Sequence, residues 1–244
     1  MRYNFGIYHW RRRLRTIVVG SVLAVLASAL YRRTESRGVR AGAVALIWWG
    51  LSEAADSVRR LASPPPWRLD GRKYELLADR LPLSTADSLL DVGCGTGRSV
   101  VGLAPALGPD CTVVGVDPFD DRVILGNGAR LARRNAAEAG VGAEMVRGDA
   151  ARLPVASDSV DVVTTARVLH DLPRPDADRA LAEARRVCAA DGTLGVLELT
   201  VTHVDAADPA RYWRDRVADA GFTVTSVERV DLGRRRYVLV VAEP

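Results

Sequence analysis

The stretch LLDVGCGTGR, residues 89–98, decides the fold of this chain. The apolar residues that open it are typical of the end of a buried strand. Three alternate glycines follow, and without a Cβ at Gly93, Gly95 and Gly97 the backbone can turn tightly and approach a ligand. A helix is predicted to begin near Arg98, with its free N–H groups facing the turn. The stretch therefore predicts a nucleotide-binding turn at the carboxyl end of a first strand.

An acid, Asp91, stands two residues before the first glycine. A dinucleotide-binding turn reads G-x-G-x-x-G and aims a helix N-terminus at a pyrophosphate, which a carboxylate at this place would repel. The carboxylate suits a ligand that carries an ammonium or a sulfonium group. A glycine-rich turn that binds nothing remains the plainest alternative, because one glycine motif alone is weak evidence.

The pattern D-x-G-x-G-x-G resembles the first motif of the class I S-adenosylmethionine (SAM)-dependent methyltransferases, in particular the type 11, UbiE-like group. Further stretches between residues 70 and 244 resemble later motifs of that family in the same order. They are residues 111–117, 143–150, LPVASDSVDVV at 153–163, VLHDL at 168–172 and 185–194. The resemblance implies an α/β, Rossmann-like, doubly wound sheet of seven strands in the order 3-2-1-4-5-7-6, with strand seven antiparallel. It also implies SAM as the cofactor.

The residues that would hold SAM follow from the same resemblance. Asp117 lies 20 residues beyond Gly97, an offset at which a carboxylate takes up ribose hydroxyls. In the family, the acid that corresponds to Asp149 meets the adenine amino group. The cofactor-binding residues implied in this way are Asp91, Gly93, Cys94, Gly95, Gly97, Asp117, Pro118, Asp149 and Ala150.

A general base is a smaller requirement for methyl transfer than alignment of the acceptor and exclusion of water. His170, within VLHDL, is the candidate base because a neutral imidazole can take a proton from a phenol or an enol. The alternative is that His170 packs beside the donor and takes no proton. Glu198 is expected to face the substrate or to pair with an arginine, His203 to be a solvated loop residue, and Asp161 to be structural.

The charge of the chain is divided unevenly. Residues 1–66 hold 11 arginines and three acids, whereas residues 67–244 hold 23 basic and 27 acidic residues. The domain itself is therefore acidic, which argues against a nucleic-acid partner. The cysteines Cys94, Cys111 and Cys188 have neither metal-ligand nor disulfide spacing, and the first two are expected to be buried. No metal site is predicted.

Residues 1–66 are predicted to be a basic membrane-anchoring segment ahead of a methyltransferase domain at 67–244. Their apolar runs, at about 16–31 and 41–51, are shorter than the ~20 residues of a full membrane span. A helical hairpin that spans a thin region or lies partly in one leaflet is expected, and the prolines at 64–66 end it. The catalytic domain would then face the cytoplasm, where SAM is made.

Two spans would place the arginines of the loop between the runs outside, against the positive-inside rule, whereas a re-entrant hairpin keeps them inside. A secretory signal is a further alternative for this segment, because Ala27-Ser28-Ala29 resembles a cleavage site. Export would separate the enzyme from its donor.

Helices are expected at 74–81, 98–107, 120–139, 174–190 and 208–220, and the last two strands at 222–227 and 237–241. The sequence predicts a membrane-associated SAM-dependent methyltransferase with a small, lipophilic acceptor such as a quinone, an isoprenoid or a lipid. A non-catalytic SAM-binding membrane regulator and an NAD(P)-dependent oxidoreductase are the alternatives. The sequence leaves the acceptor atom and the oligomeric state open.

Overall fold

The computed structural model describes residues 3–61, 63, 65–233 and 235–244. Pro64 of the proline-rich spacer lies outside the described residues. The chain forms two contact units. The hairpin unit comprises Tyr3–Arg68 and Asp120–Gly126, and the sheet unit comprises Leu69–Phe119 and Asn127–Pro244.

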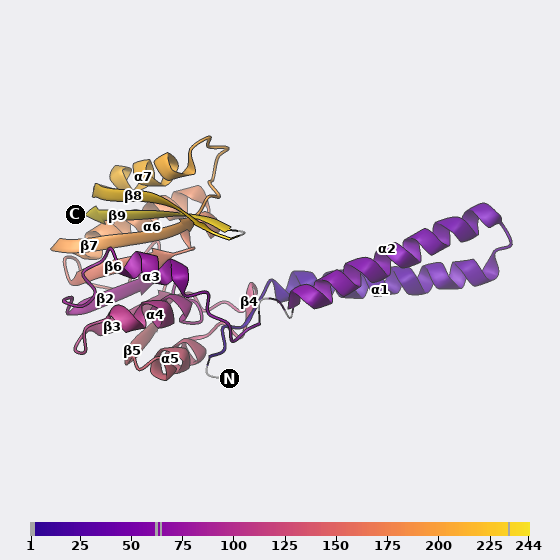
Figure 1. Ribbon diagram of the computed structural model, residues 1–244, viewed down its shortest axis with the longest axis horizontal. Coiled ribbons are helices and arrows are strands. Elements are labelled where there is room, and N and C mark those ends of the chain that lie inside the picture. Colours follow the sequence, from indigo (N-terminus) through magenta and orange to yellow (C-terminus); the bar gives the residue numbers. More distant parts are fainter. Residues whose placement is uncertain (1–2, 62, 64, 234) are drawn as a thin grey trace. The chain divides into compact units, whose positions relative to one another are not determined.

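The sheet unit is built on seven strands in the order β5-β3-β2-β6-β7-β9-β8 (Figure 1). The first five strands of that order are parallel, and β9 runs antiparallel to both of its neighbours. Counted along the chain, this is the predicted order 3-2-1-4-5-7-6, which is confirmed. The strands are β2 Ser88–Val92, β3 Thr112–Asp117, β5 Ala143–Arg147, β6 Val160–Ala166, β7 Cys188–Leu199, β8 Thr223–Leu232 and β9 Arg235–Glu243.

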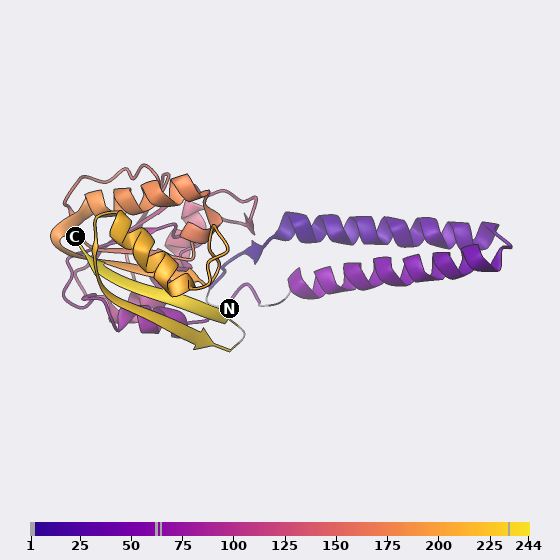
Figure 2. The ribbon, with the colours of Figure 1, turned by 90° about the horizontal axis from the view of Figure 1, so that it is seen from above.

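Helices cover both faces of the sheet, as the views of Figures 1 and 2 agree. Successive strand residues point to opposite faces, so that Leu89 packs with the residues of α3, α4 and α5, and Leu90 with those of α6 and α7. Both side chains are 1% exposed, as expected for parallel strands buried on two sides. The helices are α3 Arg72–Ala78, α4 Arg98–Leu103, α5 Ala129–Glu138, α6 Arg174–Val187 and α7 Pro209–Asp219, with short 3₁₀ turns at Ala104–Ala106 and Leu169–Asp171.

The hairpin unit consists of two long antiparallel helices, α1 Trp10–Arg33 and α2 Arg37–Leu61 (Figure 2). They meet through small residues: a Cβ added at Gly20 would lie 2.5 Å from the carbonyl oxygen of Gly50, and the converse holds for Gly50. The helices run well beyond the apolar runs of 16 and 11 residues, because arginine-bearing turns extend them at their ends. α1 is long and apolar enough to cross a membrane by length and composition, a test that buried core helices and signal sequences also pass.

The predicted helix at 120–139 is wrong in its first half. Only residues 129–138 are helical, whereas β4, Ile124–Leu125, pairs antiparallel with β1, Ile7–Tyr8. Gly126 follows with a φ of 86°, a backbone conformation that a helix does not allow. The chain between β3 and α5 is therefore a strand of the hairpin unit rather than the start of a helix.

Candidate functional site

The three glycines of the turn after β2 all have positive φ, between 53° and 77°. Two of them are required by packing. A Cβ at Gly93 would lie 2.3 Å from Val168 Cγ2, and one at Gly97 would lie 2.9 Å from the carbonyl oxygen of Ala132. A Cβ at Gly95 meets nothing closer than Asp117 Oδ2, at 4.0 Å. Gly95 therefore presents bare backbone to open space, which suits a closely bound ligand.

Asp117, at the end of β3, is joined directly to this turn. Its Oδ2 accepts a hydrogen bond from the backbone N–H of Gly95 at 3.0 Å, and its Oδ1 accepts from the backbone N–H of Phe119 at 2.7 Å. Asn127 also donates from its side-chain amide to Oδ1, at 3.1 Å. Burial raises the pKa of Asp117 and outweighs these hydrogen bonds. The carboxylate is thus held in one orientation at the carboxyl end of the sheet.

Asp91 lies beneath the turn and is fully buried. Its Oδ1 accepts from Thr164 Oγ1 at 3.0 Å, and its Oδ2 accepts from the hydroxyl of Ser99. Burial raises the pKa of Asp91 to about 7, against the opposing effect of these two hydrogen bonds. The side chain therefore ties β2 to β6 and to α4.

The remaining predicted cofactor residues differ in how they are presented. Cys94 is 3% exposed, and its Sγ lies 3.8 Å from Met145 Sδ in the core, so that only its backbone belongs to the turn. Pro118 is exposed at the same edge of the sheet, and Ala150 is buried. Asp149 is exposed and lines a cavity of about 660 Å³.

The strand ends bring the predicted residues to one edge, and the structure adds two that the sequence analysis missed. Phe119, with a φ of 51°, holds the Asp117 carboxylate through its backbone N–H, while its side chain is 5% exposed and packs in the core on the face of α3, α4 and α5. Asn127 reaches the same carboxylate from the start of the segment that leads to α5. Gly126 and Gly128 around this asparagine were the only sequence signal that the segment was irregular.

His170 has a partner that the sequence analysis did not identify. Its Nδ1 lies 2.6 Å from Glu198 Oε2, and the other oxygen of Glu198 accepts from the backbone N–H groups of Val168 and Leu169, at 2.8 and 2.7 Å. The Glu198 side chain is 0% exposed and that of His170 is 9% exposed. Burial acts to lower the pKa of His170, but the hydrogen bond to Glu198 and its charge outweigh burial, and the net pKa is raised.

This pairing fixes the histidine tautomer. A carboxylate can only accept, so Nδ1 carries the proton and Nε2 is left to take one. Neither expected role of Glu198, facing the substrate or pairing with an arginine, is its observed role, because it faces an imidazole and two amides. The Asp171 carboxylate lies 3.5 Å from Nε2 and is largely exposed.

Three secondary expectations can also be compared with the structure. His203 is not a solvated loop residue, because its Nδ1 lies 2.7 Å from the Tyr212 hydroxyl and its Nε2 lies 2.9 Å from the carbonyl oxygen of Leu172. Cys111 is only partly buried, since it precedes β3 at the amino edge of the sheet. Asp161 is structural, as expected, because its Oδ2 accepts from the amides of residues 87 and 88.

Lys73 is the single lysine of the chain, and the sequence analysis assigned it no role. It lies on α3 with its side chain 3% exposed, and its Nζ donates to the carbonyl oxygen of Asp70 at 2.8 Å. The ammonium lies 4.7 Å from the ring centre of Tyr74 and 6.0 Å from that of Tyr237. Burial lowers the pKa of Lys73 to about 8. Lysine at this place connects α3 to β9.

Residues 89–192 match the family model described as a methyltransferase domain. Among curated relatives, a demethylmenaquinone methyltransferase of Lactobacillus johnsonii is 34% identical over 119 residues, which are 49% of this chain and 46% of that protein. A 27-O-demethylrifamycin SV methyltransferase of Amycolatopsis mediterranei is 31% identical over 162 residues, 66% of this chain and 55% of that protein. The chain thus spans about half the length of these relatives.

Solved structures share the fold. The [4+2]-cyclase SpnF superposes with a TM-score of 0.58 at 20% identity, covering 71% of this chain and 80% of that one. A putative methyltransferase of Bacillus halodurans gives a TM-score of 0.56 at 18% identity, covering 71% of this chain and 98% of the other. Within this fold, activity depends on the residues at the site.

Proposed function

Residues 89–192 of this chain form a SAM-dependent methyltransferase domain, and we propose that the whole chain methylates a small, lipophilic acceptor at a membrane. One observation carries the SAM-binding half of the proposal. The backbone N–H of Gly95 is bonded to Asp117 Oδ2, while the Cβ side of Gly95 is open. An acid and bare backbone therefore meet at the carboxyl edge of a parallel sheet, where ligands of such folds bind.

The residues at this edge suit SAM. Asp117 offers carboxylate oxygens for ribose hydroxyls, and Asp149 offers a carboxylate for the adenine amino group. Asp91 supplies negative charge under the turn for the cationic end of the donor. When bound, SAM supplies a methyl group on a sulfonium that is already a good leaving group. The chain then has to orient the acceptor, exclude water and accept a proton.

His170 is the residue proposed to accept that proton. Glu198 holds Nδ1–H, so that Nε2 can take the proton of a phenol or an enol as its oxygen or carbon is methylated. The carboxylate also stabilises the imidazolium that results, in the way an orienting acid does in a triad. Because a thiol or an amine acceptor would need such a base less, the pair favours a weakly acidic hydroxyl compound.

A membrane location is the second half of the proposal. Among the described helices, α1 is long and apolar enough to cross a membrane by length and composition: its 24 residues give about 36 Å of helix at 1.5 Å per residue, against a hydrocarbon core of ~30 Å. α2, of 25 residues, packs against it. Large apolar side chains on these helices are exposed, and Trp48 is 74% exposed. The small-residue contact between Gly20 and Gly50 is typical of helices that pack in lipid. We propose that the hairpin anchors the chain with its domain in the cytoplasm.

The acceptor class follows from this location and from one relative. The Lactobacillus johnsonii relative is a demethylmenaquinone methyltransferase, and a demethylated quinone in its reduced form is a phenol held in the membrane. Such a compound would reach a membrane-anchored site without leaving the lipid.

The test is incubation of the full-length chain with methyl-labelled SAM and a total membrane lipid extract, followed by identification of the labelled product. Label in a lipid-soluble phenol or quinone supports the proposal. A matched reaction with Asp117→Ala should lose the label, because SAM binding is lost. Label only in water-soluble acceptors would overturn the lipophilic acceptor.

Two alternatives predict different results in the same assay. A non-catalytic SAM-binding regulator binds SAM in calorimetry but transfers no label to any extract. An NAD(P)-dependent oxidoreductase binds NAD(P) and not SAM. Both alternatives are included because the fold alone does not determine the activity.

A further inference from the structure

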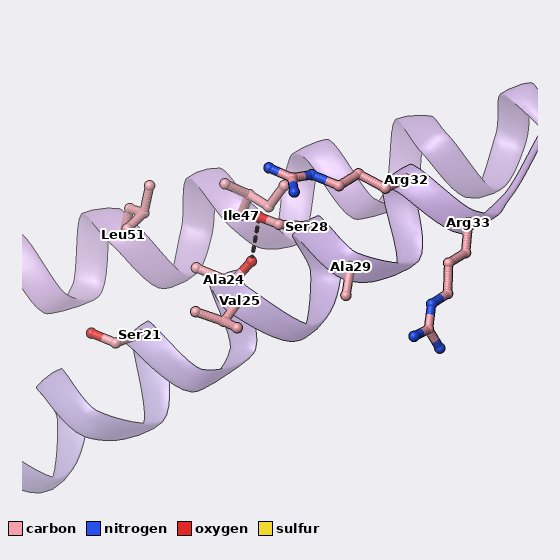
Figure 3. Close-up of a pocket in the computed structure, with 9 residues that line it drawn as sticks. All are labelled: Ser21, Ala24, Val25, Ser28, Ala29, Arg32, Arg33, Ile47 and Leu51. Atoms are coloured by element: carbon pink, nitrogen blue, oxygen red, sulfur yellow. Dashed lines mark hydrogen bonds between the residues drawn. The ribbon is translucent and has the colours of Figure 1, made fainter.

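A groove between the two helices of the hairpin unit is separate from the methyltransferase site. It has a volume of about 680 Å³, within the ~300–1,000 Å³ range of small-molecule sites. Figure 3 shows its wall, which α1 and α2 both supply. Val25 and Ala29 come from α1, and Ile47 and Leu51 come from α2.

The wall of this groove is apolar. Serine is the polar residue along it, and Ser28 already donates its hydroxyl to the carbonyl oxygen of Ala24 at 2.7 Å (Figure 3). Ser28 therefore does not need a polar partner from a ligand. Val25 and Leu51 are 67% and 54% exposed in the structure. A hydrocarbon chain laid in the groove would cover both apolar side chains. Ser21, the second serine that lines the groove, is exposed in the structure.

The end of the groove near the turn of the hairpin is cationic. Arg32 and Arg33 both line it; in Figure 3 the Arg32 side chain extends toward Ser28 and Ile47, whereas the Arg33 side chain points away from Arg32, so that a shared anion would require Arg33 to change its rotamer. Neither arginine makes a salt bridge within the described part of the chain. Arg37 and Arg40 follow in the sequence, with Glu35 as the one acid between residues 30 and 45. An unneutralised arginine pair beside an apolar groove complements an amphiphile with an anionic head.

We propose that this groove binds an acidic phospholipid, with its phosphate on the Arg32–Arg33 pair and one acyl chain along Val25, Ala29, Ile47 and Leu51. Arginine suits a phosphate because its planar guanidinium can donate two parallel hydrogen bonds. The quinone-like methyl acceptor is neutral and would leave the arginine pair without a counter-charge. The inference rests on the proposed membrane location of the hairpin.

The experiment uses the full-length chain in a neutral detergent with equal amounts of phosphatidylglycerol and phosphatidylcholine. Native mass spectrometry then counts the lipids retained. Both lipids carry a phosphate, but phosphatidylcholine also carries a quaternary ammonium and has no net charge. Two arginines at about 1 kcal/mol each toward the net negative charge of phosphatidylglycerol predict a preference for it of roughly thirtyfold. The double variant Arg32→Gln, Arg33→Gln should reduce the preference to within about twofold of unity. The control Arg12→Gln, Arg15→Gln removes the same charge from the other end of α1 and should keep the wild-type preference.

A second pair of variants tests the apolar wall. Ala29→Phe fills the groove and should prevent retention of phosphatidylglycerol, whereas Leu26→Phe, at a residue that does not line the groove, should not. Equal retention of the two lipids by the wild type overturns the inference. So does a wild-type preference in the Arg32, Arg33 variant. A dimer that Ala29→Phe dissociates would assign the groove to a second copy of the chain instead.

Flotation with phosphatidylcholine vesicles distinguishes failure of the lipid site from failure of the proposed membrane location. A chain that floats with these vesicles but shows no preference in mass spectrometry keeps its membrane location and loses the lipid site. A chain that floats with neither neutral nor phosphatidylglycerol-containing vesicles loses both.

Discussion

Glu198 Oε2 lies 2.6 Å from His170 Nδ1, and the Glu198 carboxylate is completely buried. The two residues are 28 positions apart in the sequence, and the chain between them includes all of α6, so that this pair exists only in the folded sheet. A buried carboxylate that also accepts two backbone amides is held rigidly. The hydrogen bond to this carboxylate therefore also fixes the orientation of the imidazole, and Nε2 is the ring nitrogen that can accept a proton.

Replacing His170 is expected to slow methyl transfer to a phenolic acceptor without lowering the affinity for SAM. General bases contribute roughly 10²–10⁴-fold, so His170→Ala should lower kcat by about 100-fold or more. Calorimetry should give the same Kd for SAM as in the wild type. A kcat within about threefold of the wild type would mean that His170 only packs beside the donor.

The pH dependence of kcat should show the effect of Glu198 on the pKa of His170. The base is active when neutral, so kcat is expected to rise with pH through the raised pKa of His170, above its ordinary value of about 6.5. In Glu198→Gln the favourable charge is lost and burial dominates, so the midpoint should move below about 6.5. A profile whose midpoint does not move would contradict the pairing.

Gly95→Ala is expected to weaken SAM binding by about tenfold or more, because a methyl group would occupy the open side of the turn. Gly140→Ala is the matched control: its φ is 83°, and a Cβ there meets nothing within 4 Å. Both substitutions place a Cβ on a residue with positive φ, which should lower the free energy of unfolding by a similar ~1 kcal/mol, measured by thermal unfolding. Only Gly95→Ala should change the Kd for SAM. Equal Kd values in the two variants would remove Gly95 from the site.

SAM affinity should depend on the ionisation of Asp91. The cationic donor favours the carboxylate form, so binding lowers a pKa that is about 7 in the free chain and releases a proton. The affinity should therefore rise with pH up to about 7 and become level above it. Below that pH it should fall by up to about tenfold per pH unit. Calorimetry of SAM binding at pH 6, in two buffers of different ionisation enthalpy, measures the number of protons released. Asp91→Asn should bind more weakly, with a flat profile and no proton release.

The hairpin should depend on the close approach of its helices. A side chain at Gly50 would lie 2.5 Å from the backbone oxygen of Gly20, so Gly50→Leu is expected to separate α1 from α2. Gly42→Leu is the control, since a Cβ at Gly42 meets nothing within 4 Å. Heating the full chain in detergent and measuring what stays in solution should show a lower midpoint for Gly50→Leu alone. The same thermal midpoint for both variants would argue against the close contact between Gly20 and Gly50.

Local sequence patterns predicted the sheet well, because strands buried on both faces are nearly continuous apolar runs. The glycine turn and Asp117 could be found for the same reason: each lies at the end of such a run. The segment 120–128 could not be predicted, since its partner strand, Ile7–Tyr8, is more than 100 residues away. Glu198 had no local signal for its partner either. Its carboxylate comes within hydrogen-bond distance of His170 only when β6 and β7 are paired.

The pairing of β1 with β4 means that the chain passes between its two units three times, after residues 68, 119 and 126. Asp121 accepts from the Trp10 indole at 2.7 Å and from Arg11 at 3.2 Å, within the hairpin unit. A truncation that begins at residue 67 would therefore remove the proposed membrane anchor and also the partners of a segment that starts three residues after Asp117, the proposed ribose-binding acid. Lost activity in such a protein would not be evidence for a membrane-borne substrate. Exchanging the apolar surface of α1 and α2 for polar residues, with β1 retained, would remove the proposed membrane contact and leave that segment paired.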